Sequence, residues 1–195
     1  MRQPELAPPA QRRQEVRAVV QPLGAVKLAG KAAGNDLAVL LAEDAASASA
    51  SRADHPLFAV LRMQHDLGKQ SRIGMAYTDR TDGANWNRVL DVDGRLVWNT
   101  INTFQYQLAG SMTKQGTVQT NGPLWDLRLN RISRNLAIRS SFTGIGDQFV
   151  TKSGFLSRTG EVHVTLAPRY TWFFPRGSTV EQFSFDVVPL DLLWN

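Results

Sequence analysis

The stretch QSRIGMAYTDRTDGANWNRVLDVDGRLVWN, residues 70–99, decides the fold class of this chain. From Trp86 onward, alternate residues fall into two sets. One set is mostly apolar and runs Trp86, Arg88, Leu90, Val92, Gly94, Leu96, Trp98. The other is mostly polar and runs Asn87, Val89, Asp91, Asp93, Arg95, Val97, Asn99. A period of two is typical of a β-strand with one apolar and one polar face.

The length of this strand suits a membrane. A strand from Trp86 to Trp98 spans roughly 40 Å at about 3.3 Å per residue, or roughly 30 Å along a barrel axis if it tilts by about 40°. This height is close to that of a bilayer hydrocarbon core. An apolar band with aromatic ends is typical of outer-membrane barrel strands. The stretch therefore favours a bilayer-spanning strand.

The same alternation recurs before and after this stretch. Residues 57–66, 103–113, 124–130, 136–143 and 162–174 each show it, with turn signals between them. We expect an all-β fold, an antiparallel up-and-down meander of about ten long strands that forms part of a transmembrane β-barrel. A short strand is also expected at 15–20, an interruption at 121–123, and a change of phase near Pro189.

Composition bounds the organisation of the chain. Its 195 residues suffice for one substantial domain. Residues 1–13 are rich in proline and charge and predict a disordered lead, which leaves 14–195 as the barrel segment. There is no secretory signal, and the final residues are strand-like without a polar tail. We therefore expect an internal fragment, with a barrel incomplete at both ends.

Charge and cysteine content exclude several classes of protein. The chain has no cysteine, so it has neither disulfides nor thiolate metal sites. The net charge is +5, but the arginines are scattered singly instead of forming the patch that nucleic-acid binding requires. No apolar run is long enough for a transmembrane helix.

Several segments resemble a known family. They are LGAVKLAGKAAGNDLAVLLAED (23–44), GKQSRIGMAYTDR (68–80), NWNRVLDVDGRL (85–96) and GDQFVTKSGFLSRTGEV (146–162). They look like the barrel region of domain-of-unknown-function family 5916. The resemblance implies a bacterial outer-membrane β-barrel without an established activity. It also implies an upstream domain similar to the family 9 carbohydrate-binding module, which this sequence lacks. No catalytic residue can be carried over from the family.

Polar residues on the alternating strands are candidates to line the lumen of such a barrel. They are Arg72, Asp91, Asp93, Arg95, Asp126, Arg128, Arg139, His163 and Arg169. One interpretation makes them the wall of a pore for polar or anionic solutes. The other makes them a salt-bridge network inside a narrow or plugged barrel. Asp91 and Asp93 are better explained as members of this set than as an acid–base pair.

Aromatic residues near the expected strand ends are candidates for the membrane interface. They are Tyr77, Trp86, Trp98, Phe104, Trp125, Trp172 and Phe174. Arg88 is the exception on the lipid-facing side. Because it lies near a strand end, we expect its long side chain to extend to the interface.

Enzymatic and cofactor signatures are missing from the sequence. His55, His65 and His163 lack metal-ligand spacing, so we expect no metal site and no cofactor. The segments at 68–71 and 144–147 are turns between strands, and no crossover helix follows them to hold a phosphate. No nucleophile motif is present, so no catalytic residue is predicted.

Three hypotheses follow from these patterns. The leading one is part of a bacterial outer-membrane barrel that transports or handles polar solutes or glycans at the surface. Its partners would be outer-membrane lipid and the barrel assembly machinery, without nucleic acid. The second is a soluble all-β barrel that binds a small ligand and points its apolar set inward. The third is a glycan-active enzyme on a β-scaffold.

Overall fold

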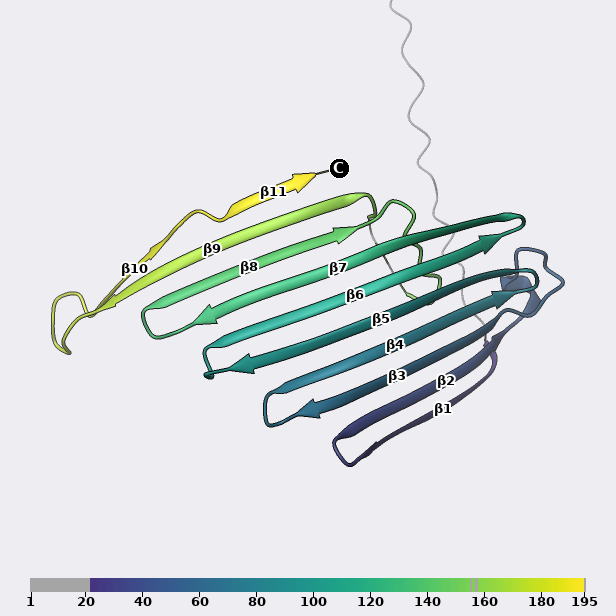
Figure 1. Cartoon of the computed structure of the whole chain (residues 1–195), viewed down its shortest axis with the longest axis horizontal. Helices are drawn as coiled ribbons and strands as arrows, with labels where there is room; N and C mark the ends of the chain where they lie inside the picture. The colour runs from purple at the N-terminus through teal and green to yellow at the C-terminus, as the bar shows by residue number, and fades with distance from the viewer. Residues whose placement is uncertain (1–21, 155, 157, 195) are drawn as a thin grey trace, which may run out of the picture.

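The computed structural model describes residues 22–194 apart from 155 and 157, and they form one antiparallel sheet (Figure 1). Its strands are β1 (Pro22–Ala32), β2 (Asn35–Asp44), β3 (Leu57–Leu67), β4 (Ser71–Asp82), β5 (Asn85–Trp98), β6 (Asn102–Gln115), β7 (Val118–Ile132), β8 (Leu136–Ile145), β9 (Glu161–Phe173), β10 (Gln182–Asp186) and β11 (Leu190–Trp194). Consecutive strands are neighbours through β10, and β11 also pairs with β9. The expected all-β antiparallel meander is confirmed, and the lead at 1–13 and the strand at 15–20 lie outside the described residues.

Two details differ from the sequence-based expectation. The prediction of an interruption at 121–123 is wrong, because β7 is continuous through Pro123. Pro123 lies where pairing with β8 ends, a position at which the missing N–H is tolerated. The expected change of phase near Pro189 is confirmed, because Phe185 and Leu190 both lie opposite even-numbered residues of β9. The strand also breaks there, since β10 ends at Asp186 and β11 begins at Leu190.

The two ends of the sheet carry different connections. At one end the chain reverses mostly in short turns, such as Ala33–Gly34 with φ of 50° and 77°, and in a longer loop at 174–181 between β9 and β10 (Figure 1). Positive φ at both turn residues is typical of the tight hairpin turns that match strand twist. The opposite end carries two longer loops, residues 45–56 and 146–160 (Figure 1). The short helix η1 (Ala46–Ala48) lies in the first of them.

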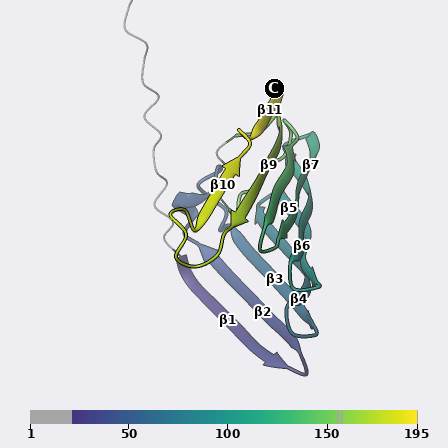
Figure 2. The ribbon, with the colours of Figure 1, turned by 90° about the vertical axis from the view of Figure 1, so that its left-hand side faces the viewer.

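The sheet curves but does not close. Figure 2 shows β1 and β10 on the same side of the central strands. Within the described residues, no strand pairs with the outer edge of β1 or with the free edges of β10 and β11. No helix in this part of the chain is long and apolar enough to cross a membrane.

The sheet buries little apolar surface. Among the described residues, Val89 and Phe149 are the buried hydrophobic side chains. Large apolar residues instead lie exposed in cross-strand rows. One row runs Leu37, Met63, Met75, Val92, Leu108, with exposed fractions of 42–52%. The sheet therefore presents a continuous apolar face to its surroundings.

Aromatic rings on this apolar face cover glycines in neighbouring strands. The Tyr106 ring lies over Gly94, where an added Cβ would be 2.6 Å from Tyr106 Cε1. Trp125 covers Gly144 in the same way. Both glycines are the direct cross-strand partners of these aromatics. An aromatic ring over a strand glycine protects the exposed backbone and fixes the register.

Candidate functional site

The polar face of the sheet carries all the residues that the sequence predicted to line a lumen. Residues directly opposite each other on antiparallel strands point to the same side. Arg72 lies opposite Arg95, and Gln105 joins Arg95 to Arg128 across β6. Alternation from this row places on one face Arg72, Asp91, Asp93, Arg95, Asp126, Arg128, Arg139, His163 and Arg169. Their role as a lumen wall stays a prediction.

Ion pairs neutralise much of this face. The ion pairs are Lys31 with Asp66, Arg62 with Asp93, Arg128 with Asp126, and Arg169 with Asp186, and a hydrogen bond joins His163 to Asp191. Such pairs are what the salt-bridge interpretation predicts. The side chains of Arg72 and Arg95 form no ion pair or hydrogen bond with a described residue. The face is thus partly self-neutralised and partly left positive.

Arg62 is a member of this network that the sequence analysis missed. Its Nη2 donates a hydrogen bond of 2.9 Å to Asp93 Oδ2, two strands away. The guanidinium crosses β4 at Gly74, where an added Cβ would lie 2.8 Å from Arg62 Nη2. A glycine inside an alternating strand indicates close approach of another group, and Gly74 was the available signal.

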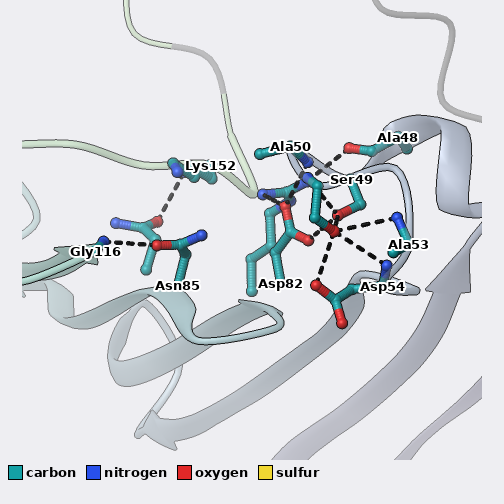
Figure 3. Close-up of polar contacts among 12 residues, drawn as sticks. Ala48, Ser49, Ala50, Ala53, Asp54, Asp82, Asn85, Gly116 and Lys152 are labelled. Carbon is teal, nitrogen blue, oxygen red and sulfur yellow. Dashed lines mark hydrogen bonds and ion pairs between the residues drawn. The ribbon is translucent and has the colours of Figure 1, made fainter.

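The loop 45–56 folds onto the polar face and is fixed to the end of β4 (Figure 3). The buried carboxylate of Asp82 accepts hydrogen bonds from Ser49 Oγ and from the Ala50 N–H, the latter at 3.2 Å. Arg80 Nη2 donates to the Ala48 carbonyl at 3.2 Å. These contacts join residues at least 32 positions apart, so no local sequence pattern predicts that the loop docks on β4.

The loop 146–160 docks on the same face through Asn87, which has no exposed surface. Asn87 Nδ2 donates to the Val150 carbonyl at 2.9 Å, and Asn87 Oδ1 accepts from the Lys152 N–H at 2.8 Å. Ser111 Oγ accepts from the Val150 N–H at 3.1 Å. Phe149 packs its backbone against Gly122, where any Cβ would collide with it.

The two loops meet around a small group of charges. Arg80, Asp82 and Lys152 line one hollow together with Ser49 of the first loop. Arg80 Nη1 lies 3.5 Å from Asp82 Oδ2. Burial lowers the pKa of the Lys152 ammonium, and the charge of Arg80 lowers it further, while Asp82 opposes both effects. Each loop therefore contributes to one polar junction above β4 and β5.

Arg88, the charged residue expected on the lipid-facing side, forms an ion pair on the apolar face. Its Nε donates to Asp79 Oδ2 at 3.0 Å, and its guanidinium lies 4.6 Å from the centroid of the Trp86 ring. Asp79 is its direct cross-strand partner. Arg88 therefore has both an ion-pair partner and an aromatic contact, and its expected extension to a membrane interface stays a prediction.

The interface aromatics divide into two groups. Trp86, Trp98, Phe104, Trp172 and Phe174 lie at or just beyond strand ends, as expected. Tyr77 and Trp125 lie in the middle of β4 and β7, so the strand-end prediction is wrong for them. Local contacts explain both, because the Tyr77 hydroxyl donates to Asp79 at 3.1 Å and Trp125 covers Gly144.

Comparison with known proteins identifies no match to this chain. No protein-family model matches the chain, and no curated protein or solved structure matches it. The resemblance to domain-of-unknown-function family 5916 therefore stays a prediction. Within the described residues, no group of three His, Cys, Asp or Glu side chains could hold a metal ion.

Proposed function

We propose that this chain forms a sector of a bacterial outer-membrane β-barrel, with its apolar face toward lipid and its polar face toward an aqueous lumen. The observation that carries the proposal is the exposed apolar face, on which apolar side chains form rows across the long strands, such as the row from Leu37 to Leu108. Soluble proteins rarely expose apolar patches of this extent unless the patch binds something.

Strand length supports the same proposal. β5 has 14 residues, which at about 3.3 Å per residue and a tilt of about 40° gives a height of roughly 35 Å. This is enough to cross a hydrocarbon core of about 30 Å and leave both ends in the interface. The pairing of Arg88 with Asp79 also fits a lipid-facing position, since a lone charge there would be costly.

The proposal requires that the free strand edges become paired in the membrane, since unpaired backbone groups are not tolerated in lipid. Further strands, or pairing of β1 with β10 and β11, would close the ring with the help of the barrel assembly machinery. The polar face would then serve the passage or surface handling of polar solutes or glycans. The loops 45–56 and 146–160, which lie over that face, would narrow the opening at one end.

Vesicle insertion tests this proposal. The full chain is refolded in detergent micelles and mixed with phosphatidylcholine vesicles that carry brominated acyl chains. The protein should float with the vesicles, and the bromines should quench Trp98 and Trp125, which share the apolar face. A chain that stays monomeric and folded in plain buffer, without binding vesicles, contradicts the proposal and favours the soluble ligand-binding barrel.

A further inference from the structure

Two arginines face each other directly on the polar face. Arg72 of β4 and Arg95 of β5 are cross-strand partners, and both side chains are exposed. Like charges at directly opposed positions destabilise a sheet. The two guanidinium groups therefore destabilise the sheet unless a group of opposite charge lies between them.

The nearby carboxylates provide only part of that charge. Asp66, the cross-strand partner of Arg72 on β3, forms an ion pair with Lys31, with Nζ and Oδ2 2.6 Å apart. Asp93 of β5 accepts a hydrogen bond from Arg62 of β3. Asp126 is held by Arg128 Nη2 at 2.6 Å. Each of these acids therefore already has another basic partner. Arg72, which lies opposite Asp66, is only partly compensated, and Arg95 has no acidic cross-strand partner, so the pair keeps an excess of positive charge.

The surroundings of the pair are open and rich in donors. Arg72 and Arg95 together line two adjacent hollows of the sheet surface. One hollow adds Lys69 and Gln70 from the turn between β3 and β4. The other adds Gln105, the partner of Arg95 on β6. A small ligand could thus reach both guanidinium groups and further hydrogen-bond donors at once.

We propose that Arg72 and Arg95 form a binding site for small oxyanions, that is, for the carboxylate or phosphate group of a polar solute. The planar guanidinium fork matches such groups with two parallel hydrogen bonds. One bound oxyanion converts the repulsion between the arginines into two charge-assisted contacts. The site deepens the proposed function, on which its place in a lumen rests, by naming an anionic solute class.

Binding of inorganic phosphate to the full chain tests the site. Titration calorimetry at low ionic strength is performed in whichever medium keeps the chain monomeric, either micelles or plain buffer. We expect saturable binding that weakens by about tenfold or more in Arg72→Gln and in Arg95→Gln, because either change removes one guanidinium fork. Arg95→Lys, which keeps the charge but lacks the fork, should fall between these variants and the wild type. Acetate should compete, and glucose should not.

The matched control is Arg131→Gln, which removes the same charge from the opposite face of β7 and should leave binding unchanged. Equal weakening in all three glutamine variants overturns the site, because net charge alone would then explain binding. Absence of saturable binding to the wild type also overturns it. If the chain binds phosphate but does not bind vesicles, only the membrane proposal is refuted. If the chain inserts into vesicles but does not bind phosphate, only the oxyanion site is refuted.

Discussion

At the residue scale, Gly74 allows an ion pair on the polar face to span three strands. Because Gly74 has no side chain, the guanidinium of Arg62 crosses β4 and reaches Asp93 on β5. The contact joins strands that are not neighbours, so it stabilises the sheet beyond its backbone ladder. Neither Arg62 nor Asp93 alone shows this in the sequence, since the pairing depends on the register of three strands.

Gly74→Ala should therefore destabilise the sheet. The new Cβ would stand 2.8 Å from Arg62 Nη2, which would displace the guanidinium and free the Asp93 carboxylate. We expect the free energy of unfolding to fall by about 0.5–1 kcal/mol in a urea titration, because the ion pair that is lost is partly exposed. Gly110→Ala is the control, because nothing lies within 4 Å of a Cβ at this mid-strand position.

A double-mutant cycle with Arg62→Gln makes this prediction sharper. If the loss arises through the ion pair, adding Gly74→Ala to Arg62→Gln should cost much less than Gly74→Ala alone. Fully additive losses would contradict the role assigned to Gly74.

At the scale of elements, the strands were far more predictable than the loops. The phase of β5 could be read from alternation alone, and the structure places Asn87, Asp91, Asp93 and Arg95 on one face as expected. Docking of the loop 146–160 could not be predicted, because Asn87 bonds to a carbonyl 63 residues away and no local pattern encodes such a contact. Local periodicity reports burial on a strand, but not which distant loop provides it.

Loop docking depends on Asn87, and Asn87→Ala should release the loop 146–160. The substitution removes both the amide donor to Val150 and the acceptor of the Lys152 N–H. Because these part-buried backbone groups of the loop would lose their partners, we expect a loss of about 1–3 kcal/mol in the free energy of unfolding. Trypsin should also cut faster at Lys152 and Arg158 in the folded protein.

The exposed Asn121 provides the control for this prediction, because the hydrogen bonds that hold the loop do not involve it. Asn121→Ala should leave both the unfolding curve and the rate of cleavage unchanged. Equal cleavage rates in Asn87→Ala and the wild type would show that other contacts hold the loop.

At the scale of the whole molecule, the two faces of the sheet should respond oppositely to charge. Leu108 is 49% exposed on the apolar face, and Gln107 beside it lies on the polar face. In a bilayer, Leu108→Arg should reduce the free energy of unfolding by about 2–4 kcal/mol, because it places a charge near the midplane. Gln107→Arg should cost little, because residue 107 lies on the polar face, which the proposed function turns toward water.

This comparison is measured on the protein in vesicles and again in plain detergent-free buffer where the chain remains soluble. A penalty confined to Leu108→Arg in vesicles supports a lipid-facing apolar surface. Similar small effects of both substitutions in vesicles would contradict it.

The meander also has a consequence for the order of folding. Every strand through β10 pairs with the strand that precedes it, so the sheet can grow one hairpin at a time through local contacts. The hydrogen bonds from Asn87 to Val150 and Lys152 span 63 and 65 residues. They can form only after β6, β7 and β8 have paired. We expect this junction to close late, so the kinetics of loop docking should report completion of the sheet.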